Sequence, residues 1–105
     1  MQIQVNTDHN IQGTEVFAAH VRGVVEHALA HFHDRVTRVE VHVSDQNGVK
    51  GGQDDHACSM EVRLEGRQPA AASHRAPTAD LAVHGAADKL KRAIENILGR
   101  QGDRR

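Results

Sequence analysis

Positively charged residues recur along one face of the last predicted helix, where they could bind a phosphate backbone. At about 100° per residue, Lys89, Arg92 and Arg100 fall in one narrow band beside the apolar stripe. Asn96 lies in the same band, and Lys91 lies on the other flank. Phosphates repeat at regular spacing and need positive charge more than a fixed side-chain geometry, so this row suits nucleic acid. A solvated helix face with ordinary Lys and Arg is the alternative, and the pattern alone favours it.

Histidines form a second candidate group, on the first predicted helix. His20, His27 and His31 lie on one strip, because steps of seven and four residues return to the same helix angle. The pair at i and i+4 could hold a metal ion, but no Cys or carboxylate completes a helix-borne set at the expected spacing. We therefore predict no metal site and no cofactor. Two interpretations stay open: a polar border beside the core, or side chains that become cationic on acidification and strengthen nucleic-acid binding.

A glycine-rich segment joins the second and third predicted strands. It contains Gly51, Gly52 and Gln53, the tripeptide found at the catalytic tip of class I peptide release factors. Asp54 and Asp55 follow directly and would be repelled by phosphate. A loop between neighbouring strands also needs Gly for its turn geometry. We therefore expect a plain mobile loop over residues 45–55.

Other catalytic arrangements are not indicated. The single cysteine, Cys58, alternates with core-facing residues, which predicts a small buried hydrophobic side chain and not a nucleophile. The adjacent carboxylates of Asp54 and Asp55 give no acid–base geometry. No phosphate-binding glycine loop of the nucleotide-binding types is present. The sequence therefore predicts a protein that is not an enzyme and has no small-molecule substrate.

Alternating strands and amphipathic helices must position these residues. Alternation predicts strands at residues 2–6, 36–44 and 58–65, and a weaker one near a sheet edge at 69–76. Apolar spacing to about Phe32 predicts a helix that begins at Thr14, a candidate N-cap, and ends near His33 and Asp34. A second helix begins after the N-cap Thr78 and ends at Gly99 or Gly102. The order β-α-β-β-β-α predicts a two-layer α+β domain, with both helices on the sheet face of Val39, Val41, Val43, Met60, Val62 and Leu64.

Composition limits the chain to one modest core and a balanced surface. Its 105 residues fit a single domain over 1–105, with a frayed tail at 100–105. Aromatic residues make up only 2%, so the core must be aliphatic, with two Phe. The net charge of −1 argues against a generally basic nucleic-acid binder, but not against charge gathered on one face. The opening MQIQVNTDHN has no secretory features and no apolar run reaches membrane-spanning length, so we expect a soluble cytoplasmic protein without a membrane partner.

Four segments, taken in order, resemble the ribosome hibernation promoting factor family, which includes ribosome-associated inhibitor A and proteins once labelled sigma-54 modulation proteins. They are the opening residues 1–6, the helix start at Thr14 and Glu15, residues 33–36, and residues 88–94 in the last helix. The resemblance covers essentially the whole chain, and the order and spacing of the motifs carry more weight than any single one. It implies a fold similar to double-stranded-RNA-binding domains.

The resemblance implies a factor that binds the small ribosomal subunit and its ribosomal RNA. In this family the domain occupies the channel for mRNA and the tRNA anticodon ends, and so blocks translation under stress or in stationary phase. We expect a monomer or a weak homodimer. The family's basic helix positions carry over to the first three of six candidate RNA-binding residues, and the other three are weaker candidates: Lys89, Arg92, Arg100, Lys91, Arg22 and Arg75.

The chain departs from the family pattern at positions expected to contact RNA. The tripeptide at 78–80 is Thr-Ala-Asp where members usually have Asp-Met-Tyr, so the Tyr is absent. Apolar residues or His also replace basic residues of the family's first helix. These changes are expected to weaken the RNA contact. An alternative interpretation therefore stays open: a His-rich, metal-responsive binding module on the same fold, without ribosome binding, with the ligands His20, His27 and His31.

Overall fold

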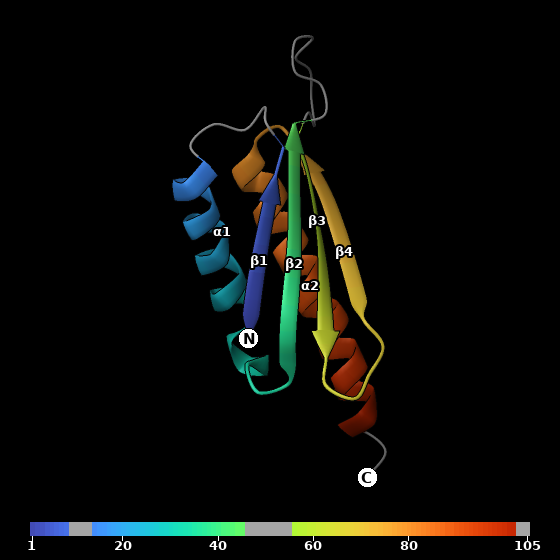
Figure 1. Ribbon diagram of the computed structural model, residues 1–105. Helices are drawn as coiled ribbons and strands as arrows, with labels where there is room; N and C mark the ends of the chain where they lie inside the picture. The colour runs from blue at the N-terminus through green and yellow to red at the C-terminus, as the bar shows by residue number, and fades with distance from the viewer. Residues whose placement is uncertain (9–13, 46–55, 103–105) are drawn as a thin grey trace.

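Four strands form one sheet in which the spatial order follows the sequence order (Figure 1). They are β1 (Gln2–Thr7), β2 (Val36–Asp45), β3 (His56–Leu64) and β4 (Ala70–Ala76). β1 pairs with β2 in parallel, and β2, β3 and β4 form an antiparallel meander. The computed structural model describes residues 1–8, 14–45 and 56–102. The Gly-Gly-Gln tripeptide of the expected loop, and residues 103–105 of the expected tail, lie outside the described residues.

Both helices cover the same face of the sheet, which gives the domain its two layers (Figure 1). α1 (Thr14–Ala28) packs against β1, α2 (Ala79–Gly102) packs against β3 and β4, and the two helices contact each other. α1 supplies the crossover that a parallel β1–β2 pair requires. The predicted β-α-β-β-β-α two-layer α+β fold is therefore confirmed. In the part of the chain that the structure describes, neither helix has an apolar stretch long enough to span a membrane.

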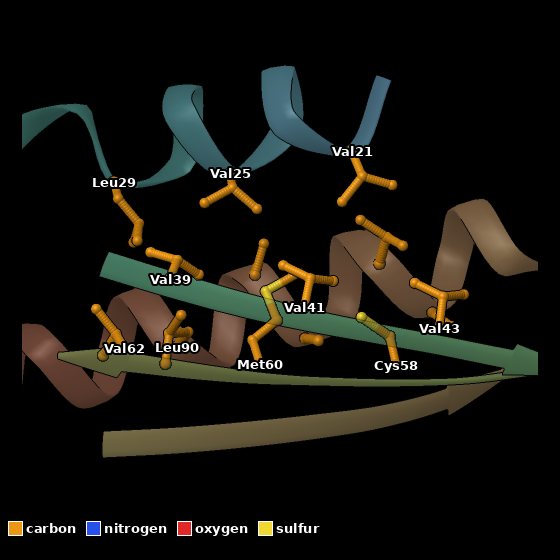
Figure 2. Close-up of a cluster of buried hydrophobic side chains, with 14 of the residues drawn as sticks. Val21, Val25, Leu29, Val39, Val41, Val43, Cys58, Met60, Val62 and Leu90 are labelled. Atoms are coloured by element: carbon orange, nitrogen blue, oxygen red, sulfur yellow. The ribbon is translucent and has the colours of Figure 1, made fainter. Parts of the chain in front are cut away.

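The core is aliphatic and lies between the sheet and the helices. All six apolar strand residues expected on this face are buried, and the antiparallel register pairs Val39 with Val62 and Val41 with Met60. Figure 2 shows Val21 and Val25 of α1, and Leu29 just after the helix, above β2, and Leu90 of α2 belongs to the same buried cluster. Each of these side chains is fully buried, so the hydrophobic effect fixes the helix positions relative to the strands. Cys58 is buried in this core as predicted, and desolvation raises the pKa of its thiol to about 12.

The first helix is shorter than its apolar spacing predicted. α1 ends at Ala28, and a 3₁₀ turn, η1 (Ala30–Phe32), follows it. Leu29 leaves the helical conformation, with φ −105° and ψ 18°, while its side chain stays fully buried. The tighter turn brings the chain round to β2, where the Arg35 amide donates to the Phe32 carbonyl at 2.8 Å. The predicted helix end near His33 and Asp34 was therefore wrong, because an apolar pattern does not distinguish an α-turn from a 3₁₀ turn.

The β2–β3 hairpin extends further toward its loop than the alternation predicted. Asp45, expected in the loop, pairs with His56, which lies before the predicted start of the third strand. The Asp45 amide also donates to Oδ2 of Asp8 at 3.1 Å, and the Asp8 amide donates to the Val43 carbonyl at 3.2 Å. These bonds satisfy backbone groups at the end of the sheet and so extend the strands past the last apolar residue.

The start of α2 is capped, and the helix then approaches β4 closely. Oγ1 of Thr78 accepts the Leu81 amide at 3.1 Å, which confirms the predicted N-cap. At Gly85 a Cβ atom would lie 2.1 Å from the ring of His74 on β4, so only glycine fits without a shift. The helix ends at Gly102, one of the two glycines predicted. The absence of a side chain at Gly85 therefore sets the distance between α2 and β4.

Candidate nucleic-acid interface

Lys89 reaches from α2 to the edge of the sheet. It lies one turn after Gly85, and its Nζ donates to the backbone carbonyl of Ser73 on β4 at 3.1 Å. β4 is an edge strand of the described sheet, and an ammonium group at such an edge covers a backbone acceptor that another strand could otherwise pair with. The close approach of α2 at Gly85 therefore places the positive charge of Lys89 at the border between helix and sheet.

Arg75 lies on the same strand as Ser73, two residues further along, and is exposed. Both residues line a shallow hollow of about 280 Å³ on the outer face of the sheet, together with His42 and Ser59. Lys89 binds the carbonyl of Ser73, so it contacts the same strand that carries Arg75. We call Lys89, Ser73, Arg75 and the neighbouring Arg92 the β4-edge cluster.

Arg92 lies one turn beyond Lys89 and forms an ion pair with Asp88. The arginine and aspartate side chains are 70% and 56% exposed. An exposed i, i+4 pair contributes only about 0.3–0.5 kcal/mol, so a phosphate could displace Asp88 at little cost. Arg92 is thus available to a polyanion even though it has a partner within the chain.

The other predicted RNA-binding residues lie on different surfaces. Lys91 lines a groove between α1 and α2, where His27 and Asp88 also lie. Arg22 lines a hollow between α1 and β1. The side chain of Arg100 lies outside the described residues, although its backbone belongs to α2. Of the six candidates, Lys89 and Arg92 lie one turn apart on α2, and Lys89 contacts the strand that carries Arg75.

The outer face of the sheet alternates in charge from row to row. Arg38 and Arg63 pair directly across β2 and β3, and the next row places Glu40 opposite Glu61. Arg38 also forms an ion pair with Glu40 at 3.3 Å and donates to Gln4. The acidic row would repel a phosphate backbone that crossed the middle of the sheet. The acidic row therefore lies between the Arg38–Arg63 pair and the hollow beside Arg75.

Sequence reasoning did not single out two residues that line the hollow beside Arg75. His42 and Ser59 pair directly across β2 and β3, and both are exposed. Their only signal in the sequence was their outward position in the alternating strands. Alternation identifies the face of a sheet but not which strands lie side by side, so the hollow itself could not be expected.

The three histidines expected on one strip do not form a group of metal ligands. α1 ends at Ala28, so His31 lies in the 3₁₀ turn and loses its helical i, i+4 relation to His27. His20 instead contacts α2, with its Nε2 2.6 Å from Oδ1 of Asp80, and Nε2 of His84 lies 3.4 Å from the same oxygen. The structure therefore brings His20 together with Asp80 and His84 of α2, and not with His27 and His31 as the predicted strip had it.

Comparisons with known proteins agree with the fold and identify a family. The family model described as sigma 54 modulation protein / S30EA ribosomal protein matches residues 3–101. A search of curated proteins found no match. Among solved structures, the Protein Y N-terminal domain of Thermus thermophilus is similar at 20% identity and a TM-score of 0.65, covering 92% of this chain and 99% of that one. A ribosomal subunit interface protein from Coxiella burnetii is similar at 14% identity and a TM-score of 0.68, covering 94% and 99%.

Proposed function

Since the chain belongs to the sigma 54 modulation protein / S30EA ribosomal protein family and is therefore a ribosome-associated factor, we propose that it binds the small ribosomal subunit in the mRNA and tRNA channel. Bound there, it blocks translation under stress or in stationary phase. The observation that carries this proposal is the family match over residues 3–101, nearly the whole described domain. The proposed action is occupancy of the channel and needs no catalytic group.

The β4-edge cluster is the proposed contact with ribosomal RNA. Lys89 would exchange the neutral carbonyl of Ser73 for a phosphate oxygen, whose full negative charge attracts the ammonium group more strongly than a carbonyl dipole does. Arg92 would likewise leave Asp88, and Arg75 lies beside the hollow. The cationic side chains come from α2 and β4, which pack on each other through Gly85 and His74. Such packing holds the cationic side chains in fixed positions. A rigid domain can then keep mRNA and tRNA out of the channel that it occupies.

Co-sedimentation with small subunits across a salt series tests the proposal. Each phosphate contact contributes about −0.9 to the slope of log K against log salt, so three contacts give a slope of about −2.7. Affinity carried by the cluster would then fall about 40-fold between 50 and 200 mM salt. The triple variant Arg75→Ala, Lys89→Ala, Arg92→Ala should lose this dependence and bind more weakly at low salt.

A second triple variant controls for net charge. Arg22→Ala, Arg63→Ala, Lys91→Ala removes the same charge from other surfaces and should leave most of the binding intact. Equal weakening by both variants would count against the β4-edge cluster. Absence of wild-type binding at low salt, at both pH 6 and pH 8, would count against ribosome binding itself.

Competition tests the proposed position in the channel. Small subunits loaded beforehand with mRNA and initiator tRNA should bind the protein less tightly than empty subunits. The protein should also inhibit translation in a purified system, and the cluster variant should inhibit it less. Equal binding to loaded and empty subunits would place the contact elsewhere on the ribosome. Protein levels measured through growth and starvation would test the proposed role in stress.

A further inference from the structure

A histidine from α1 and two residues from the start of α2 point their side chains at one another. Within the described residues, His20, Asp80 and His84 form a group in which one donor atom of each lies within 4.8 Å of the others. Both imidazoles direct Nε2 at the same carboxylate oxygen, Oδ1 of Asp80, at 2.6 Å and 3.4 Å. The rings of His20 and His84 meet edge to face, with centroids 6.1 Å apart. Three donors of two chemical types therefore converge from two helices.

The two histidine–carboxylate distances are close to those of a tetrahedral metal site, and the donor atoms of the two imidazoles lie within 4.8 Å of each other. Zinc bonds of about 2.0–2.1 Å place neighbouring donors about 3.3 Å apart. Nε2 of His84 and Oδ1 of Asp80 are already at 3.4 Å. Nε2 of His20 would need to move away from Oδ1 by less than about 1 Å. All three side chains are about half exposed, so small rotations can make this change without disturbing the core.

We propose that His20, Asp80 and His84 form a binding site for a divalent transition-metal ion, with Zn²⁺ as the probe and water in the fourth position. Imidazole nitrogen and carboxylate oxygen are common zinc ligands, whereas Mg²⁺ prefers oxygen ligands alone. The positive end of the α2 dipole disfavours a bare cation, and the carboxylate of Asp80 in the first turn offsets it. The ion would join α1 to α2.

The proposal does not depend on ribosome binding. Asp80 and Lys89 are nine residues apart on α2, so at about 100° per residue they lie on opposite sides of the helix. The metal site faces α1, whereas Lys89 reaches β4. A failed ribosome experiment would leave the metal site untouched, and a failed metal experiment would leave the ribosome proposal untouched.

Isothermal titration of untagged, chelator-treated protein with Zn²⁺ tests the site. We expect one ion per chain, no saturable binding of Mg²⁺, and visible absorption bands of tetrahedral geometry when Co²⁺ replaces zinc. Each of His20→Gln, Asp80→Asn and His84→Gln should weaken zinc binding by more than about tenfold, since even the partners that orient ligands contribute that much. The ligands come from both helices, so only the folded chain brings them together and binds zinc tightly. Zinc at 100 times its Kd should therefore raise Tm by about 10 °C.

The double variant His27→Gln, His31→Gln is the matched control, because it removes the histidine pair that sequence spacing favoured. It should bind zinc as the wild type does. Loss of binding in this control but not in His20→Gln would overturn the proposal in favour of a site within α1 and η1. Absence of stoichiometric binding in the wild type would reduce the group to an exposed ion pair. Circular dichroism of each variant separates lost ligands from lost folding.

Discussion

Replacing Gly85 by Ala tests how closely α2 must approach β4 to place Lys89 at the sheet edge. A Cβ at this position would lie 2.1, 2.4 and 2.6 Å from three ring atoms of His74. Ordinary contacts between such atoms begin near 3.4 Å, so the ring or the helix must move by about 1 Å. His74 is half-buried between strand and helix, which leaves its ring little room. The substitution should therefore either displace the ring or push α2 away from β4.

Two terms of opposite sign set the magnitude. Ala is about 1 kcal/mol better than Gly inside a helix, which favours the variant. Overpacking a filled site costs about 1–3 kcal/mol, which opposes it. We therefore expect Gly85→Ala to destabilise the protein by about 0–2 kcal/mol. In a His74→Ala background the steric cost disappears, and the same substitution should stabilise by about 1 kcal/mol.

Urea denaturation of the four proteins in this cycle measures the coupling between Gly85 and His74, which should be about 1–3 kcal/mol. Gly23→Ala is the matched control, because a Cβ at Gly23 on α1 would meet nothing within 4 Å. It should stabilise by about 1 kcal/mol whatever residue occupies position 74. A Gly85→Ala variant as stable as Gly23→Ala, with no coupling to His74, would refute the close approach of helix and strand.

Three further predictions concern the cap, the buried thiol and the outer face. Thr78→Ala should cost about 1 kcal/mol in urea denaturation, and Thr78→Ser should not, because only the alanine leaves the Leu81 amide without its cap. Burial raises the pKa of Cys58 to about 12 from 9.0, so the folded state holds this proton more tightly than the unfolded state. This contribution to stability should therefore be complete below pH 9 and fall as the pH rises toward 12, by at most about 1.4 kcal/mol per pH unit. The urea midpoint of the wild type should then be lower at pH 10 than at pH 8. In Cys58→Ala this part of the difference should disappear. Glu61→Gln should raise stability by about 0.2–1 kcal/mol by removing the like charge opposite Glu40, and a loss of stability would contradict that reasoning.

Alternation predicted the sheet because one of its faces is fully buried. With period two, any register shift of one residue would bring Val39 and Val41 to solvent, so the valine pattern determines which face packs. The order of elements then restricted the topology to a few choices, of which the meander is the simplest. Helix ends were less predictable. Leu29 suits an α-helix as well as a 3₁₀ turn, and only the path back to β2 selects the turn.

The contacts of the candidate sites were not predictable from spacing. His20 and Asp80 are far apart in the sequence, and their contact depends on how α1 and α2 are rotated and offset after both pack on the sheet. Gly85 shows the same limit in another way. From the sequence alone, a glycine within a helix only predicts a loss of stability through conformational entropy. The contact with His74 explains why glycine is needed at this position. Lys89 was a predicted site residue, but its position at the edge carbonyl of Ser73 follows from that close approach.

The two sides of α2 carry different charged groups. One side faces α1 and the other reaches β4. The flank toward α1 carries Asp80, His84 and Lys91, and Asp88 lies between this flank and Arg92, with which it pairs. The flank toward β4 carries Lys89, which reaches an edge strand. A phosphate backbone would be repelled on the first flank and attracted on the second, whereas a metal cation would be favoured on the first. A chain with a net charge of −1 can therefore bind a polyanion at one edge, because binding depends on the local charge at that edge and not on the net charge.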